Sequence, residues 1–304
     1  MISIIIPTYN AQNYLVKLLD KIKNQSLANY ELIIIDSSSS DQTVVIAKKY
    51  TDNVIVIPQS EFDHGGTRAK AAQIAKGEIL VFLTQDALPL DNNTIENIVK
   101  VFKNPKVGAA YGRQLSYEET SLFGKHLREF NYKNNSYTRN KTNIKEFGLK
   151  TAFLSDSFAA YRRSSLESVG WFKDGLILGE DTYVGAKMIL AGYSLAYVAD
   201  AKVYHSHSYT IWQEFKRYFD IGVFHKTEEW ILKEFGKAEG EGMKYIRSEI
   251  NYLLKNDAWY LLPEFILRNG MKYIGYKLGQ KYKKLPMWMI KKFSMHHRWW
   301  DKKN

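Results

Sequence analysis

Two carboxylates follow short apolar runs, at points where a strand would end. Asp36 comes after Tyr30–Ile35 and precedes four serines, and Asp86 comes after Ile79–Leu83. At such a position Asp36 could accept hydrogen bonds from a base or ribose. Asp86 could bind a hard divalent cation, and that cation could also bind a diphosphate. A turn that caps the next helix would explain either residue without a ligand.

A glycine pair and a cation form a second motif, His64-Gly65-Gly66-Thr67-Arg68. Glycine lets the backbone approach a ligand closely, and a guanidinium can pair with phosphate. A plain turn with a solvent-exposed Arg68 is the alternative.

Adjacent acids form a third motif, Glu180-Asp181, at the start of a segment with helical spacing. Burial or a neighbouring like charge raises the pKa of a carboxyl group, which suits a general base. Acids that cap a helix and favour its dipole are the alternative.

A pair of histidines, His205 and His207, follows two apolar runs. In a strand the two side chains would share one face, and an imidazole could complete a metal site begun by Asp86. Two surface histidines in a polar turn would also fit.

The elements that must position these motifs alternate between strand and helix. This alternation predicts an α/β fold with a parallel, doubly wound sheet, in which ligands bind beyond the carboxyl ends of the strands. The expected strands are Ile2–Ile6, Tyr30–Ile35, Val54–Ile57 and Ile79–Leu83, and the expected helices are Ala11–Gln25, Asp41–Tyr50, Thr67–Ala75 and Thr94–Phe102.

The rest of the chain divides into two parts. The polar, asparagine-rich stretch Ser116–Lys150 is expected to be a mobile loop over a site. After Tyr209 the pattern becomes helical, over Ile211–Phe224, Glu228–Phe235 and Met243–Leu254. We therefore expect a nucleotide-binding and catalytic domain at 1–210 and a helical C-terminal region at 211–304.

The net charge of +11 over 304 residues is concentrated at the end of the chain. Residues 265–304 hold 11 Lys+Arg and one acid, so residues 1–264 are close to neutral, with 32 Lys+Arg against 31 acids. The absence of cysteine excludes disulfides and thiolate metal sites. Neither a signal peptide nor an 18-residue apolar span is visible.

Aromatic and basic residues are interleaved in this tail. Such a composition suits an interfacial anchor on anionic lipid, with 286–304 as its last part. A core-packing helix with a solvated lysine face is the alternative. Binding to nucleic acid is a rival class, although the basic excess lies outside the α/β part and no nucleic-acid motif is visible. A sugar-binding protein without catalysis is a third possibility.

Taken in order, the motifs resemble the family-2 inverting glycosyltransferases of GT-A fold. The resemblance spans about residues 1–210 and implies a nucleotide-sugar donor, a divalent cation and a sugar hydroxyl as acceptor. It rests on Ile4-Ile5-Ile6-Pro7-Thr8-Tyr9-Asn10, Asp36 with Asp41, Gly65–Arg68, Gln85-Asp86, Glu180-Asp181 and His205.

The resemblance also implies roles at matching positions. Asp181 would be the catalytic base. Asp86 would match the last acid of the DXD-type metal motif, which reads Thr84-Gln85-Asp86 here and lacks its first acid. His205, or alternatively His207, would complete the site for Mn²⁺ or Mg²⁺. The nucleotide would be bound by Pro7, Thr8, Tyr9, Asp36, Arg68 and Gln85.

Within that family, Phe62–Arg68, Thr84–Ala87 and Ser155–Arg163 look like bacterial rhamnosyltransferases. The implied donor is dTDP-β-L-rhamnose, with a UDP-sugar as the alternative. The implied acceptor is a lipid-linked saccharide in surface polysaccharide synthesis, with Asp156, Ser157 and Glu180 on its side. A cytoplasmic location on the inner face of the bacterial cell membrane would follow.

Overall fold

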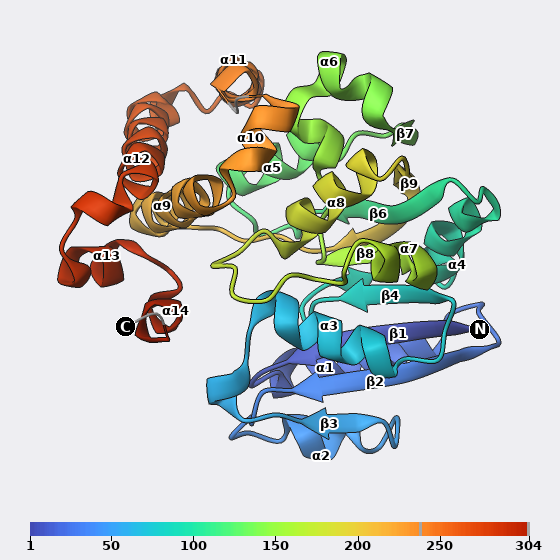
Figure 1. Cartoon of the computed structure of the whole chain (residues 1–304). Helices are drawn as coiled ribbons and strands as arrows, with labels where there is room; N and C mark the ends of the chain where they lie inside the picture. The colour runs from blue at the N-terminus through green and yellow to red at the C-terminus, as the bar shows by residue number, and fades with distance from the viewer. Residues whose placement is uncertain (237–238, 303–304) are drawn as a thin grey trace.

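The computed structural model describes residues 1–236 and 239–302 (Figure 1), so the end of the basic tail, 303–304, lies outside the described residues. One central sheet carries the site. Its strands follow the order β3 (Val54–Val56), β2 (Tyr30–Asp36), β1 (Ile2–Thr8), β4 (Ile79–Leu83), β8 (Phe158–Arg162), β6 (Val107–Leu115), β9 (Ser194–Tyr204) and β5 (Leu88–Pro89), and β7 (Tyr137–Arg139) pairs with β9.

The sheet is parallel in its first half and mixed in its second. Strands β3, β2, β1 and β4 pair in parallel, β8 is antiparallel to both β4 and β6, and β6 is parallel to β9. The parallel half confirms the expected α/β architecture. Strand β1 continues through Pro7 to Thr8, two residues beyond its expected end.

Both faces of the sheet are buried. On β1, Ile4 and Ile6 pack in one hydrophobic cluster, and Ile5 packs in another on the opposite face. Because successive side chains of a strand point to opposite faces, this unbroken apolar run is what a doubly covered sheet needs. The expected helices are present, as α1 (Gln12–Lys23), α2 (Thr43–Ala47), α3 (His64–Ile74) and α4 (Thr94–Val99).

The glycine pair lies inside a helix, which corrects the expectation of an open, ligand-facing turn. Helix α3 begins at His64, with Asp63 as its N-cap. A Cβ atom on Gly65 would lie 1.8 Å from the carbonyl oxygen of Lys173. Glycine is therefore required there for packing between two backbone segments.

The stretch 116–150, expected to be a mobile loop, is folded. It forms α5 (Leu122–Asn131), β7 and α6 (Ile144–Phe147). Arg139 of β7 is almost fully buried, and its guanidinium donates to the carbonyls of Lys150 and Phe153. The asparagines that suggested a loop include Asn140, which caps the turn after β7.

The C-terminal half consists mainly of helices: α7 (Arg163–Ser168), α8 (Glu180–Leu190), α9 (Ile211–Thr227), α10 (Glu229–Phe235), α11 (Glu239–Lys255), α12 (Leu262–Gln280), α13 (Met287–Phe293) and α14 (His297–Asp301). Phe219, Phe235 and Trp300 belong to the same hydrophobic cluster as the sheet residue Ile5. The boundary expected after residue 210 therefore crosses a shared core, and it remains a prediction.

Helices α9 and α12 lie side by side and pack closely (Figure 1). A Cβ on Gly275 or Gly279 would lie 2.5 or 2.0 Å from the carbonyl oxygens of Phe215 and Phe219. Within the described residues, no helix is both long and apolar enough to cross a bilayer.

Candidate active site

The carboxyl ends of β1, β2 and β4 bring the first predicted site residues together. The Gln85 side chain exchanges two hydrogen bonds with the backbone of Tyr9, at 2.9 and 3.2 Å. Gln85 therefore ties the end of β1 to the end of β4. Ser157 lies at the same edge, because its carbonyl accepts a hydrogen bond from the Thr84 amide.

Asp36 is fully buried, and its carboxylate already has protein partners. It accepts hydrogen bonds from the Thr8 hydroxyl at 2.8 Å and from the Ser39 amide and hydroxyl at 2.8 and 2.6 Å. The Asp36 carboxylate caps the turn that contains Ser37 and Ser38. Asp41 accepts from the Thr43 amide at the start of α2, as expected of a residue near the N-cap.

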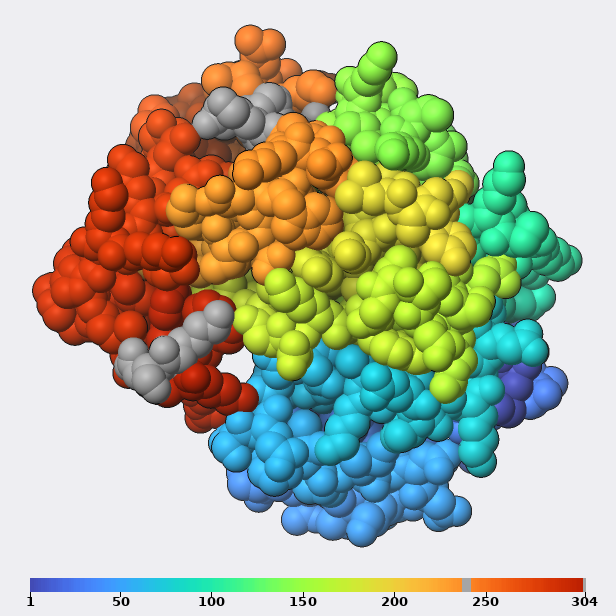
Figure 2. Space-filling model, in the orientation of Figure 1, coloured from blue at the N-terminus to red at the C-terminus, as the bar shows by residue number. Residues whose placement is uncertain are grey.

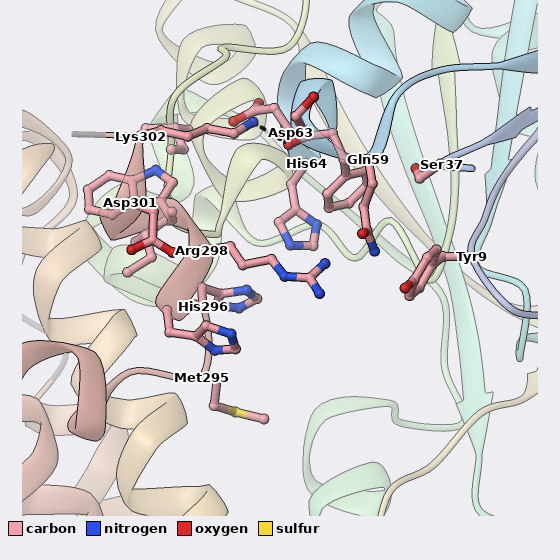
Figure 3. A pocket seen from close by; sticks show the side chains of 16 residues that line it. Tyr9, Ser37, Gln59, Asp63, His64, Met295, His296, Arg298, Asp301 and Lys302 are labelled. Atoms are coloured by element: carbon pink, nitrogen blue, oxygen red, sulfur yellow. Dashed lines mark hydrogen bonds between the residues drawn. The ribbon is translucent and has the colours of Figure 1, made fainter. Parts of the chain in front are cut away.

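A cavity of about 690 Å³ opens beside this edge (Figure 3). Tyr9, Ser37, Gln59 and His64 line it from the N-terminal half. Its other wall is the C-terminal segment, 295–302. Figure 2 shows this red segment reaching the blue and cyan N-terminal part of the surface.

The C-terminal wall is held by several specific contacts. The Trp299 indole donates to the Gly175 carbonyl at 3.1 Å, and Lys302 donates to the Phe62 carbonyl at 2.9 Å. The His296 and His64 rings meet edge to face at 5.1 Å. Trp300 is buried against the core. Trp300 therefore packs on the protein and is not available to lipid.

Arg298 belongs to this wall and was not among the predicted site residues. Figure 3 shows its side chain reaching into the cavity toward Gln59 and Tyr9. Its guanidinium makes no ion pair with any residue in the described ranges 1–236 and 239–302. The Arg298-Trp299 pair is visible in the sequence, but nothing local in the sequence says that it returns to the N-terminal half.

Asp86, His205 and His207 form a compact cluster, as the sequence predicts. One potential ligand atom from each lies within 4.8 Å of the others. The two His Nε2 atoms are 3.1 Å apart, and they lie 3.5 and 3.6 Å from the Asp86 carboxylate oxygens. His205 follows the last residue of β9, and its amide donates to Leu115 of β6.

The residues present fit a divalent cation. The Nδ1 atom of His205 lies 2.9 Å from the Gln114 Oε1 atom, an acceptor only, so Nδ1 carries the proton and Nε2 keeps its lone pair. Burial lowers the pKa of His205, and burial with the His205 charge lowers that of His207 to about 4, so both imidazoles are neutral at pH 7. A carboxylate and two neutral imidazoles suit Mn²⁺ and related ions.

A second cluster gathers three carboxylates around one cation. Arg68 pairs with Asp156 at 3.2 Å and with Glu180 at 3.1 Å, and all three side chains are buried. Asp181 lies beside them, because its Oδ2 accepts from the Asp156 amide at 3.3 Å. The alternative of a solvent-exposed Arg68 is therefore excluded.

One positive charge cannot neutralise three carboxylates, of which Asp156 and Glu180 are buried and Asp181 is half-buried. Burial and the Glu180 charge raise the pKa of Asp181 to about 6. Burial also raises the pKa of Asp156, although Arg68 opposes the shift. Arg68 lowers the pKa of Glu180. The cluster therefore tends to keep a proton near neutral pH, and Asp181, its partly exposed member, has a pKa suited to a general base.

Helix α8 positions Asp181 in its first turn. Its N-cap, Gly179, has φ +81°, and a Cβ there would lie 3.0 Å from the Phe224 ring. Glycine is needed for both reasons. The Thr182 amide donates to the Asp181 Oδ1 atom at 2.6 Å, which fixes the carboxylate.

The chain is similar in sequence to known glycosyltransferases. The family model for Glycosyl transferase family 2 matches residues 3–170. The chain is 46% identical to O-antigen chain rhamnosyltransferase WbaN of Salmonella anatum, over 98% of this chain and 95% of that one. It is 44% identical to O-antigen chain rhamnosyltransferase RfbN of Salmonella typhimurium, over 99% and 96%.

Solved structures show the fold. Mannosyltransferase PcManGT from Pyrobaculum calidifontis, in complex with GDP-Man and Mn²⁺, aligns with a TM-score of 0.64 at 18% identity, over 93% of this chain and 88% of that one. Residues 1–349 of TarS from S. aureus, solved with UDP-GlcNAc, align with a TM-score of 0.56 at 18% identity, over 93% and 91%. The expected GT-A fold is confirmed, and this chain belongs to glycosyl transferase family 2.

Proposed function

We propose that this enzyme transfers L-rhamnose from dTDP-β-L-rhamnose to a hydroxyl group of a saccharide acceptor, with inversion at the anomeric carbon. The observation that carries the chemistry is Asp181, a carboxylate held in a buried cluster with its pKa raised to about 6. The rhamnosyltransferase names of the full-length relatives support the choice of sugar.

In the proposed reaction Asp181 takes the proton from the acceptor hydroxyl as its oxygen attacks the anomeric carbon. The bond from that carbon to dTDP breaks in the same step, so no covalent enzyme intermediate is needed. Asp156, Ser157 and Glu180 lie on the acceptor side in this scheme. Arg68 pairs with Asp156 and Glu180, so we assign it to positioning the cluster rather than to direct contact with phosphate.

Asp86 and His205, with His207, would hold a divalent cation, Mn²⁺ or Mg²⁺. Bound there, such an ion supplies positive charge for the diphosphate leaving group. The 690 Å³ cavity would take the nucleotide part of the donor, with Tyr9 and Arg298 on opposite walls. Pro7 and Thr8 precede Tyr9 in the chain, and the Thr8 hydroxyl donates to Asp36. We expect these three residues to position the Tyr9 side of the cavity.

A donor screen tests the choice of sugar. Nucleotide release with Mn²⁺ present is measured from dTDP-rhamnose, UDP-glucose, UDP-galactose and UDP-N-acetylglucosamine. We expect release from dTDP-rhamnose. Release only from a UDP-sugar would reject the rhamnose assignment and leave the fold intact. Binding without transfer or hydrolysis of any donor would favour a sugar-binding protein.

We also propose that the enzyme acts at the inner face of the bacterial cell membrane, where a lipid-linked acceptor would lie. The outer face of α12 exposes Ile266, Leu267, Tyr273 and Ile274, which share one side of the helix. Further exposed aromatic residues precede and follow α12 in the chain, namely Trp259, Tyr260 and Trp288. Lys281, Lys283 and Lys284 lie next to it in the chain, as suits anionic lipid.

The charge of this region is only partly available to lipid. Arg268 and Lys272 of α12 are buried and pair with Glu214 of α9. The proposed membrane contact therefore combines the apolar face of α12 and the exposed aromatic residues, including Trp288 of 286–304, with the remaining lysines.

Vesicle flotation tests this surface. Replacement of Ile266, Leu267 and Ile274 by serine should weaken binding to anionic vesicles at least about tenfold, because each buried aliphatic side chain contributes roughly 1.5–3 kcal/mol. Val45→Ser, at an equally exposed position on α2, is the matched control. Unchanged binding would reject the surface. Salt-sensitive binding to oligonucleotides but not to vesicles would favour the nucleic-acid alternative.

A further inference from the structure

One end of the C-terminal wall is held by a buried carboxylate that has no role in the proposed reaction. Asp220 lies in helix α9, and its side chain is fully buried. Its Oδ2 atom accepts a hydrogen bond from the Met295 amide at 2.8 Å, where the wall begins. Burial raises the pKa of this carboxyl group to about 7, and hydrogen bonds from the Ser294 side chain and from the amides of Met295 and His296 oppose that shift. One carboxylate therefore holds three consecutive residues.

The other end of the wall is anchored as well. The Trp299 indole donates to the Gly175 carbonyl, and Lys302 donates to the Phe62 carbonyl. Arg298 lies in the chain between the two anchored ends. Its side chain is exposed and reaches into the cavity (Figure 3). Because the segment is fixed on both sides, the direction in which Arg298 points is fixed with it.

Two other charged side chains of the wall have partners in the protein, whereas Arg298 has none of opposite charge. Asp301 pairs with Lys291 of α13, and Lys302 is bound to a backbone carbonyl. Arg298 forms no ion pair with a carboxylate in the part of the chain that the structure describes. A guanidinium presents paired N–H donors that match phosphate oxygens. Arg298 is therefore available to an anion in the cavity.

Helix α9 also connects this wall with the metal cluster. Arg217 lies one turn before Asp220, and its guanidinium carbon is 5.8 Å from the centre of the Tyr209 ring. The Tyr209 ring centre lies 5.5 Å from that of His207. Besides burial and a neighbouring histidine, the Arg217 charge lowers the pKa of both His207 and His296. The metal cluster and the wall therefore both lie within reach of this charge, and a diphosphate on the metal would lie at this end of the cavity.

We infer that Arg298 binds a phosphate group of the donor nucleotide, and that Asp220 is a positioning residue that holds the C-terminal wall so that Arg298 can do so. The inference rests on the proposed function, because it takes this cavity as the nucleotide site. The phosphates carry the negative charge of a nucleoside diphosphate, so an unpaired cation matches them rather than the base or the sugar. Tyr9, on the opposite wall, offers its ring to the base.

Calorimetric titration with dTDP and with thymidine, in the presence of Mn²⁺, tests the role of Arg298. Arg298→Gln should weaken dTDP binding about 10- to 100-fold, the range expected for a lost hydrogen bond to a charged group. Thymidine has no phosphate and should bind equally to the variant and to the wild type. Arg247→Gln, at an exposed position on α11, is the control. Unchanged dTDP binding, or equal losses for dTDP and thymidine, would overturn the inference.

A second set of variants tests whether Asp220 acts through Arg298. Asp220→Ala removes the acceptor that holds the wall and should weaken dTDP binding at least about tenfold. Asp220→Asn keeps a carbonyl oxygen as acceptor and should bind dTDP nearly as well as the wild type. In the double variant, Asp220→Ala should add little to the loss caused by Arg298→Gln, because the two residues act as one unit. Additive losses, or an Asp220→Asn variant as weak as Asp220→Ala, would reject the positioning role.

The same titrations separate this inference from the proposed function. If the wild type binds UDP and not dTDP, the rhamnose assignment fails, and UDP with uridine then decides the role of Arg298 in the same comparison. A wild type that binds neither nucleotide would contradict the inference. Circular dichroism checks that the variants fold. If Asp220→Ala does not fold, Asp220→Ser takes its place, because its shorter side chain should also fail to hold the wall.

Discussion

The active site contains two charged clusters that are built on opposite principles. In one, Arg68 lies among Asp156, Glu180 and Asp181, and the negative charges outnumber the positive one. In the other, Asp86 faces His205 and His207, whose Nε2 atoms are only 3.1 Å apart. The first cluster is short of positive charge and tends to hold a proton near neutral pH. The second places three potential metal-ligand atoms within 4.8 Å of one another.

This difference separates two tasks that the proposed reaction needs. A surplus of buried carboxylates raises the pKa of Asp181, which suits removal of a proton. A carboxylate with two neutral imidazoles suits a cation. The two clusters do not share a side chain, although Gln114 and Ser155 connect them. Each can therefore be altered separately.

The largest effect is expected from Asp181→Asn. Loss of a general base should lower kcat about 10²- to 10⁴-fold. The free energy of unfolding should not fall, because the change removes one charge from a cluster with too many like charges. Turnover and thermal unfolding are measured together, with Asp200→Asn at an exposed position as the control. Wild-type turnover in the variant would remove Asp181 from the mechanism.

Arg68→Gln should affect stability next most strongly. Removing one partner of a buried ion pair costs about 3–5 kcal/mol of unfolding free energy. Without the cation the carboxyl pKa values rise further, so the native state binds extra protons and the loss should be larger at pH 8 than at pH 5. Denaturant unfolding at both pH values checks this.

Arg163→Gln is the control for that measurement, since the Arg163 guanidinium donates to the Gln73 carbonyl and contacts the Trp171 ring but pairs with no carboxylate among the described residues. Its effect should stay within about 0.5 kcal/mol. A loss of similar size in both variants would mean that the carboxylate cluster does not depend on Arg68.

The histidine cluster is probed through the residue that orients it. Gln114→Leu removes the acceptor for the His205 Nδ1 proton, and loss of such a partner lowers metal affinity about 10- to 100-fold. Activity is measured against Mn²⁺ concentration after treatment with EDTA, with Gln73→Leu as a surface control. Full wild-type activity in the presence of EDTA would contradict the metal proposal itself.

The smallest effect is a shift of the pH profile. With the pKa of Asp181 raised to about 6, kcat/KM should fall as the pH drops below about 6, because the base becomes protonated. Glu180→Gln removes a charge that raises this pKa, so the acidic limb should move to lower pH by roughly one unit or less. The exposed Glu167→Gln should leave it in place. A shift toward higher pH would show that the two carboxyl groups are not coupled in this way.

Local patterns in the sequence were enough for much of the fold and for the identity of both clusters. Strand and helix alternation predicts the parallel half of the sheet, because each element buries a face with its own period. Asp86, His205 and His207 were identified from residue type and position after an apolar run. Glu180 and Asp181 were identified from their place at the start of a segment with helical spacing. Parallel strands end at one edge, so side chains that follow them meet there.

What the sequence by itself could not determine was which distant side chains pair with one another. Arg68 looked like a phosphate ligand until the fold placed Asp156 and Glu180 around it. The basic tail looked like one surface, yet Arg268 and Lys272 are neutralised by Glu214, and 295–302 returns to line the cavity beside Tyr9. Residue type and periodicity are local properties, whereas the partner of a charge and the neighbour of a cavity are decided by contacts between segments far apart in the chain.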